Sequence, residues 1–385
     1  MNNFTYYNPT KIIFGENTIS QISKEIPANA RVLLTYGGGS IKTNGVYKQV
    51  MDALKGHIII EFGGIEANPQ YTTLMKAVEI CKTEKINFLL AVGGGSVLDG
   101  TKFIAAAVPF KGEPWDILAK YAKVESAIPF ASVLTLPATG SEANAFAVVS
   151  RKEIGKKLAF GAPPLTFPKF SVLDPSVTKS LSKRQRGNGV VDAFIHVTEQ
   201  YLTYPQNAAI QDRYAEAILK TLIEEGPKYV ENTDDQDAAK NVVWSATMAL
   251  NGLISAGVAT DWATHSIGHE LTVLYNIDHA RTLAIVWPGM MRVMKEEKKE
   301  KLLQFAERVW NINEGNDDVK IEKAIVKTEV FFISLGVPTT LKDYDLSRIT
   351  ISSVIKNLKA NNYVALGEKK LVTPEKVGMI LESRL

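Results

Sequence analysis

The first half of the chain alternates short apolar runs with glycine turns and helical patterns, and this alternation restricts the fold more than any other feature. The runs over 31–36 and 88–92 read as buried strands. Each is followed at once by three glycines and a serine, at Gly37–Ser40 and at Gly93–Ser96. Strand, glycine turn and helix in repetition predict a parallel sheet with helices on both faces. Such a sheet binds ligands at the carboxyl ends of its strands. Further strands are expected at 10–14, 57–62, 130–135, 146–151 and 170–173.

From about residue 180 onward the pattern is helical almost throughout. Apolar residues at spacings of three and four predict helices that include 189–202, 262–275 and a long one over 285–310. The charge run Lys295–Lys301 is expected to be a solvated helix face. The sequence therefore predicts an α/β domain over 1–178 and an all-α domain over 179–385.

The composition excludes several functions. A net charge of +3 over 385 residues gives no basic face for nucleic acid. No apolar run approaches the ~20 residues that span a bilayer, and no signal peptide is expected at the start of the chain. The single cysteine, Cys81, is expected to be a small buried apolar residue, and a lone thiol suits a reducing compartment. A cytoplasmic protein without a nucleic-acid or membrane partner is the expectation.

Four of the five histidines fall in two short segments. His265, His269 and His279 lie within fifteen residues, and His196 follows Asp192 by four, so that on a helix both side chains share one face. Imidazoles with one carboxylate suit Zn²⁺ or Fe²⁺ and are poor ligands for Ca²⁺ or Mg²⁺. Five candidates exceed what a tetrahedral catalytic site uses while one position stays open for substrate. One histidine is therefore expected to carry a proton instead of binding the metal. For any one histidine taken singly, a hydrogen-bonded core residue would be the ordinary explanation.

The glycine tract Gly93, Gly94, Gly95 and Ser96 follows a strand and opens a helix. Consecutive glycines let the backbone approach a pyrophosphate, whose charge is met by amide N–H groups and by the helix N-terminus. The tract is neither the G-x-G-x-x-G fingerprint nor a P-loop. We interpret it as a phosphate-binding turn, the alternative being a tight turn without a ligand.

The tract Gly37, Gly38, Gly39 and Ser40 ends an earlier strand. In dinucleotide-binding folds an acidic side chain at such a position usually meets the adenosine-ribose hydroxyl. None is present in this tract, and bare amides with Ser40 and Lys42 would accept a 2′-phosphate instead. The sequence thus favours NADP over NAD, against the alternative of a turn that binds nothing.

Together these segments resemble a known family. Gly93–Ser96 with Asp99 and Lys102, the segment Pro137–Glu142, and the aspartate and histidines named above resemble the iron-containing (group III) alcohol dehydrogenases over nearly the whole chain. Segments 33–40, 88–104 and 261–265 are similar to the bacterial NADPH-dependent broad-specificity aldehyde reductases, often called butanol dehydrogenases. The resemblance implies a dehydroquinate synthase-like fold, with an N-terminal NADP-binding domain and an all-α metal-binding domain. It also implies a homodimer.

The resemblance also implies roles for individual residues. It gives Asp192, His196, His265 and His279 as ligands of one divalent metal, Zn²⁺ or Fe²⁺, with His269 beside the site. It places Gly95 and Ser96 at the pyrophosphate and Asp99 near the nicotinamide, as a candidate catalytic residue together with His269. It lines the cofactor cleft with Thr135, Thr139, Asn144 and Lys157.

The expected reaction is reduction of a short-chain aldehyde to a primary alcohol by NADPH, with His269 delivering the proton. A lyase of the dehydroquinate-synthase type, which uses bound NAD, is the main alternative. It needs a basic pocket for a phosphorylated substrate, and near the metal residues the sequence offers few basic residues apart from Arg281. An NAD-dependent polyol dehydrogenase and a non-catalytic nucleotide-binding protein are further alternatives.

Overall fold

The computed structural model describes residues 1–385, which form two compact units. The α/β unit consists of Tyr7–Leu181 and Thr233–Asn251, and the helical unit consists of Met1–Tyr6, Ser182–Asn232 and Gly252–Leu385. The sequence predicts two contiguous domains that meet at 178/179, whereas the α/β unit extends to Leu181, and the units differ from that division at two further places. The first six residues belong to the helical unit, where the Asn2 N–H donates to the Gly257 carbonyl at 2.8 Å, and one helix of the second half belongs to the α/β unit.

The α/β unit is built on a six-stranded sheet in which every neighbouring pair is parallel. The expected parallel sheet is therefore confirmed. In the order β1-β8-β5-β4-β2-β3, its strands are β1 (Lys11–Phe14), β8 (Phe170–Leu173), β5 (Phe130–Leu136), β4 (Phe88–Gly94), β2 (Arg31–Tyr36) and β3 (Ile58–Phe62).

The strand order reverses between β2 and β4. After β2 the chain moves outward to β3, and it then returns to add β4 on the other side of β2, with β5 and β8 beyond. In open α/β sheets such a switch point leaves a crevice at the carboxyl ends of the two strands. Gly37–Gly39 follow β2 and Gly94–Gly95 end β4, so both glycine tracts lie at this switch point.

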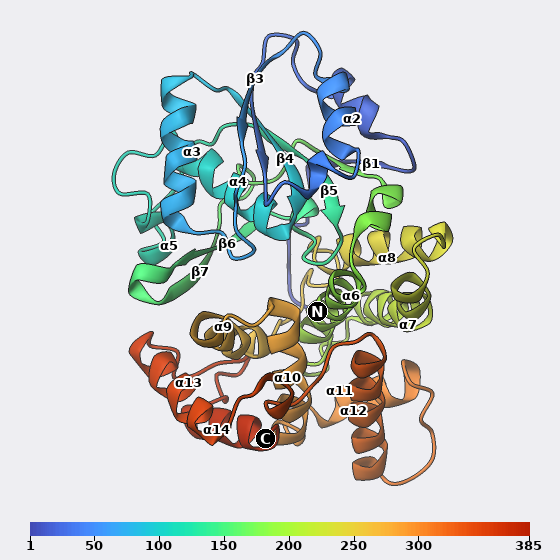
Figure 1. Ribbon diagram of the computed structural model, residues 1–385. Helices are drawn as coiled ribbons and strands as arrows, with labels where there is room; N and C mark the ends of the chain where they lie inside the picture. Colours follow the sequence, from blue (N-terminus) through green and yellow to red (C-terminus); the bar gives the residue numbers. More distant parts are fainter. The chain divides into compact units, whose positions relative to one another are not determined.

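Alternating residues of the central strands face two separate cores, because successive side chains of a strand point to opposite faces. Val32 and Leu34 pack with α1 (Ile22–Glu25) and α2 (Val46–Ala53), whereas Leu33 packs with α3 and α4. Figure 1 shows α2 on one side of the sheet and α3 on the other. The bounds of the helices on this second side are α3 (Tyr71–Thr83), α4 (Gly95–Ala107) and the short α5 (Asp116–Ala119).

Two elements of the α/β unit depart from the sequence reading. The strands β6 (Phe146–Arg151) and β7 (Lys156–Gly161) form an antiparallel hairpin, and β7 was not expected. Its first three residues are partly buried and only Phe160 is buried, a weaker pattern than that of the buried strands. Helix α8 (Gln236–Ala249) lies in this unit because Val243 packs on Leu134 and Leu173.

The helical unit contains only helices and their connections. They are α6 (Lys183–Tyr201), α7 (Ala209–Glu231), α9 (Ala263–Tyr275), α10 (His279–Val293), α11 (Lys299–Arg308), α12 (Asp317–Ser334), α13 (Arg348–Ala360) and α14 (Pro374–Glu382). Helix α6 begins six residues before the expected Gly189. A capping box explains the earlier start, since Ser182 accepts from the Gln185 N–H and Gln185 accepts from the Ser182 N–H. Because the first turn of α6 is polar, the spacing of apolar residues does not reveal this start.

The expected helix over 285–310 is wrong, because α10 ends at Val293 and α11 begins at Lys299. The charge run across this break is not a solvated face throughout. Lys298 is 2% exposed and Lys301 is 4% exposed. The Lys298 ammonium lies 2.7 Å from Asp261 and 3.1 Å from Glu368, so its burial is compensated by two carboxylates. Such pairing partners lie too far away in sequence for a charge pattern to reveal.

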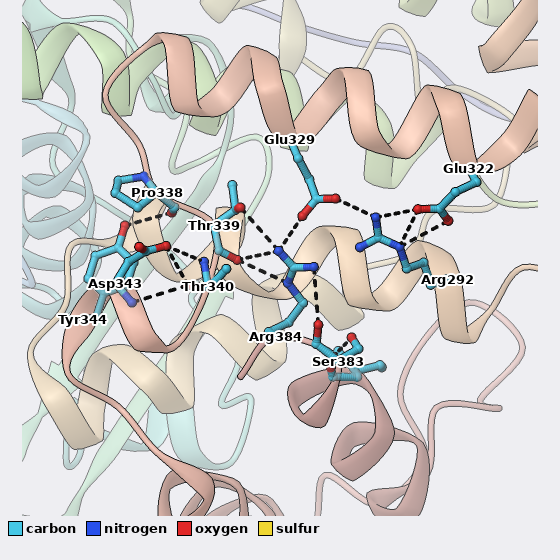
Figure 2. Close-up of polar contacts among 11 residues, drawn as sticks. Arg292, Glu322, Glu329, Pro338, Thr339, Thr340, Asp343, Tyr344, Ser383 and Arg384 are labelled. Carbon is cyan, nitrogen blue, oxygen red and sulfur yellow. Dashed lines mark hydrogen bonds and ion pairs between the residues drawn. The ribbon is translucent and has the colours of Figure 1, made fainter.

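The end of the chain is fixed by a network of ion pairs within the helical unit (Figure 2). Arg384 donates to the Glu329 carboxylate and to the Thr339 carbonyl, while Arg292 donates to the other oxygen of Glu329 at 2.6 Å and to Glu322 at 2.7 Å. The network links α10, α12 and the residues that follow α14 (Pro374–Glu382). None of the helices in the chain has both the length and the apolar character that a membrane crossing requires.

Candidate metal and cofactor sites

Three helices of the helical unit bring the predicted metal residues together. Helix α6 carries Asp192 and His196 one turn apart, α9 carries His265 and α10 begins with His279. Asp192, His196 and His265 are all less than 9% exposed, and the His279 side chain is 25% exposed. The group therefore opens toward solvent on the side of His279.

The spacing of the polar atoms fits a small cation. One ligand atom each from Asp192, His265 and His279 lie within 4.8 Å of one another. Asp192 Oδ1 is 3.7 Å from His279 Nε2 and 3.9 Å from His196 Nε2, and it accepts no hydrogen bond. The His196 and His265 rings stack at a centroid distance of 4.8 Å. A buried carboxylate oxygen facing imidazole nitrogens from three helices is the donor set that Zn²⁺ or Fe²⁺ prefers.

His269 lies beside this group. It is one turn beyond His265 on α9, and its ring centroid is 5.1 Å from that of His279 and 6.2 Å from that of His265. Neither His196 nor His269 is in the compact set of three, but His196 is buried with its Nε2 3.9 Å from Asp192 Oδ1, whereas His269 is partly exposed. This position suits the proton carrier that the surplus of histidines predicts.

The start of α10 is held by Asp278, which precedes His279. Its carboxylate accepts from Arg184 at 2.8 Å and from Asn188 at 2.9 Å, both on α6. Burial raises the pKa of Asp278, but these hydrogen bonds outweigh burial and hold the pKa below its usual range. Asp278 thus stays ionised and fixes the neighbouring His279 relative to α6.

Glu199 is a site residue that the sequence reading missed. It lies on α6 three residues after His196, it is 3% exposed, and its carboxylate contacts His265 Nδ1. Burial raises the pKa of Glu199 well above its usual value, and the nearby Asp261 carboxylate raises it further. Its spacing of seven from Asp192, two helical turns, is the only signal in the sequence that points to it.

In the α/β unit, the junction between β4 and α4 is formed by glycines, because larger side chains would clash there. A β-carbon on residue 95 would stand 2.4 Å from Thr139 Oγ1, and one on residue 93 would stand 2.5 Å from Val97. Gly95 begins α4, whose first turn has no side-chain cap. Its N–H groups are therefore available to an anion such as a pyrophosphate. The Ser96 hydroxyl donates to the Ala67 carbonyl, which leaves the Ser96 backbone amide for that role.

Asp99 and Asn144 are held in a buried polar cluster around Lys102. Asp99 accepts from Ser141 at 2.6 Å and from the Val148 N–H at 2.9 Å. Lys102 donates to Ser141 and Asn144, and burial lowers its pKa to about 8. Burial raises the pKa of Asp99 above its usual value, and the nearby Lys102 ammonium only partly offsets this rise. These contacts join α4 to the loop before β6, and the predicted place of Asp99 near the nicotinamide stays a prediction.

The remaining predicted cofactor residues lie on three segments. Gly39 adopts a left-handed conformation with φ of 95°, which favours glycine there. Thr135 is partly buried near the end of β5. Lys157 on β7 donates to Asn68 at 3.0 Å.

An acidic residue does lie near the first glycine tract, on the neighbouring strand. Glu61 of β3 accepts from Tyr36 at 3.0 Å, from Tyr47 at 2.5 Å and from Lys42 at 3.1 Å. The Tyr47 hydrogen bond is the largest cause that lowers the pKa of Glu61. The carboxylate is thus occupied by three donors, and the Lys42 ammonium is held 5.1 Å from the centre of the Tyr36 ring.

Arg281 does not provide the basic pocket that a lyase of the dehydroquinate-synthase type needs. That side chain is 8% exposed, and it donates to Asn188 at 3.1 Å and to the Gly336 carbonyl at 2.9 Å. Arg281 therefore packs the helical unit together.

Comparison with known proteins assigns the chain to a family. The model of the iron-containing alcohol dehydrogenases matches residues 9–175, and the model of the C-terminal part of the Fe-containing alcohol dehydrogenase family matches residues 188–385. This chain belongs to the iron-containing alcohol dehydrogenase family, and it is an oxidoreductase.

Individual relatives show which subgroup of the family this chain resembles. The chain is 56% identical to the NADPH-dependent aldehyde reductase YqhD of Escherichia coli over 97% of each chain, and 42% identical to a probable NADH-dependent butanol dehydrogenase of Bacillus subtilis over both whole chains. The crystal structure of E. coli YqhD superimposes with a TM-score of 0.98 over 100% of this chain and 99% of that one. The predicted resemblance to this subgroup and the dehydroquinate synthase-like fold are confirmed.

Proposed function

We propose that this chain reduces short-chain aldehydes to primary alcohols, with NADPH as the hydride donor and one divalent metal, Zn²⁺ or Fe²⁺. The observation that carries the proposal is the convergence of Asp192, His265 and His279, whose ligand atoms lie within 4.8 Å of one another. His196 stands on the same face of α6 as Asp192 and completes the proposed ligand set. The NADPH dependence of the 56% identical E. coli aldehyde reductase supports the choice of cofactor.

The protein's own residues have distinct tasks in this reaction. When bound, the metal supplies Lewis acidity toward the carbonyl oxygen and the dinucleotide supplies the hydride. Gly95 and the first N–H groups of α4 receive the pyrophosphate. Ser40, Lys42 and the glycines that precede them accept the 2′-phosphate. His269 gives its proton to the oxygen of the product, and its partial exposure lets it regain that proton from solvent.

Two further expectations belong to this proposal. A lone, buried Cys81 fits a reducing compartment, which supports a cytoplasmic location. The resemblance to the aldehyde reductases favours a homodimer, and sedimentation equilibrium of the purified protein would check it.

The decisive experiment measures initial rates with NADPH and with NADH over a series of aldehydes from acetaldehyde to hexanal, with metal analysis of the same sample. We expect NADPH oxidation with butanal, a lower kcat/KM with NADH, and about one Zn²⁺ or Fe²⁺ per chain. A protein that leaves NADPH unchanged with every aldehyde would contradict the proposal, since a lyase consumes no nucleotide.

A further inference from the structure

One buried carboxylate of α6 reaches the first turn of α9. Glu199 Oε2 contacts His265 Nδ1, and Glu199 Oε1 accepts from the Thr264 N–H at 2.8 Å and from the His265 N–H at 3.4 Å. The side chain is almost fully enclosed, so no bulk water competes for these contacts. Glu199 thereby binds both the backbone and the imidazole of one proposed metal ligand.

The contact with the imidazole selects a tautomer. A carboxylate only accepts hydrogen bonds, so the ring nitrogen that faces it carries the proton. With the proton on Nδ1, the lone pair of His265 is on Nε2, the only ring nitrogen then able to bind a cation. The other oxygen, Oε1, already accepts from two backbone N–H groups, so Oε2 is the oxygen that faces the imidazole.

The contact with the backbone replaces a helix cap. The residue before α9, Trp262, offers no side-chain cap, and the N–H groups in the first turn of a helix have no partner within the helix. Asp261 satisfies the Ala263 N–H at 2.7 Å, and Glu199 satisfies the next two. Of these two carboxylates, Asp261 pairs with Lys298, whereas Glu199 also contacts the imidazole of His265.

We propose that Glu199 is the positioning residue of the metal centre: it fixes the Nδ1–H tautomer of His265 and joins α9 to α6, so that the ligand atoms are arranged before the metal binds. This inference rests on the proposed function, because it takes His265 as a ligand. Glu199 touches no reacting atom and acts through His265 alone.

The test compares Zn²⁺ binding by purified metal-free wild type and by Glu199→Gln, using competition with a chromophoric chelator. A glutamine has the same shape, but its amide cannot accept from both the imidazole and the two N–H groups. We expect the Kd for Zn²⁺ to rise by about 10- to 100-fold in Glu199→Gln. An unchanged Kd in Glu199→Gln would overturn the inference.

Glu270→Gln is the matched control. Glu270 lies on α9, the helix that carries His265, and is 5% exposed, but its carboxylate contacts the Asn357 and Asn361 side chains instead of the imidazole. We expect its Kd for Zn²⁺ to equal that of the wild type. Equal weakening in both variants would assign the effect to general loosening of α9 and would overturn a specific role for Glu199.

A second measurement reads the tautomer in the wild-type protein itself, and a variant serves only to assign the signal. Histidine-selective ¹⁵N labelling of the metal-free wild type gives separate signals for only five residues, and loss of one signal in His265→Gln assigns His265. We expect the ¹⁵N shifts of the Nδ1–H tautomer. An Nε2–H tautomer would overturn the inference.

The same samples distinguish failure of the proposed function from failure of the role of Glu199. Wild-type protein that binds neither Zn²⁺ nor Fe²⁺ would overturn the proposed function, and with it the placing of His265 as a ligand. Wild-type binding that Glu199→Gln retains in full would overturn only the role of Glu199.

Discussion

Single residues divide the work of the metal centre between binding and proton transfer. His265→Ala removes one ligand of the proposed set, and we expect loss of the metal and loss of aldehyde reduction together. Since a metal contributes several kcal/mol to such a reaction, kcat/KM should fall by roughly 10³-fold or more. Metal analysis and initial rates on one sample check this prediction. Full activity in a metal-free His265→Ala protein would contradict it.

His269→Ala is the comparison on the same helix. Its ring stands beside the ligands, and the proposed ligand set of Asp192, His196, His265 and His279 does not include it, so the variant should keep its metal. Loss of a positioned proton donor lowers turnover by about 10²–10⁴-fold. Loss of the metal in His269→Ala would instead make this residue a ligand.

Cys81 shows how burial controls reactivity at one position. The side chain is 1% exposed in the core between α3 and the sheet, and burial raises the pKa of its thiol to about 12. Because only the thiolate reacts, we expect no modification by a disulfide reagent at about pH 8 in the native protein. One thiol per chain should react in guanidinium. Rapid reaction of the native protein would disprove the buried position.

At the scale of helices, close contacts and ion pairs set the packing of the helical unit. Gly187 of α6 touches the end of α12, where a β-carbon would stand 2.2 Å from the Leu335 carbonyl oxygen. Gly187→Ala should lower the free energy of unfolding by about 1–3 kcal/mol or more, because the helices must move apart. Denaturant unfolding measures this loss.

Gly378→Ala on α14 is the matched control for that substitution. Its β-carbon would meet Ile355 at an ordinary 3.5 Å. We expect a gain of about 0.5–1 kcal/mol, since alanine restricts the unfolded chain. Equal destabilisation by both substitutions would argue against the close approach at Gly187.

A second prediction at the scale of helices concerns the ion-pair network around Arg384. Arg384 is 5% exposed. Its replacement removes the hydrogen bonds that it donates to the Glu329 carboxylate and to the Thr339 carbonyl (Figure 2). Arg384→Met should therefore lower the free energy of unfolding by about 2–3 kcal/mol. Arg348→Met, at an exposed pair with Glu382, should cost at most ~1 kcal/mol. Equal losses in denaturant unfolding would contradict the importance of burial.

For the whole molecule, the two units carry separate parts of the chemistry. Every residue assigned to the cofactor lies in the α/β unit, and every proposed metal ligand lies in the helical unit. Removal of the metal with a chelator should therefore abolish turnover and leave NADPH affinity unchanged. Fluorescence titration with NADPH checks this prediction, and re-addition of Zn²⁺ or Fe²⁺ is the control. Loss of NADPH binding from a folded, metal-free protein would contradict it.

The sequence by itself determined the parallel sheet and both glycine turns, because apolar periodicity and turn glycines act within a few residues along the chain. It also supplied the candidate metal residues, since a spacing of four on a helix places Asp192 and His196 on one face. The resemblance then selected among those candidates, which the spacing alone left open.

Only the tertiary structure decided which distant groups meet. The contact of Glu199 with His265 joins positions 66 residues apart, and the burial of Lys298 depends on Asp261 and Glu368. Helix α8 joins the α/β unit because Val243 packs on that unit's core, although its sequence reads like any other helix of the second half. Such contacts depend on how whole helices pack together, and the local sequence pattern of a single helix does not reveal them.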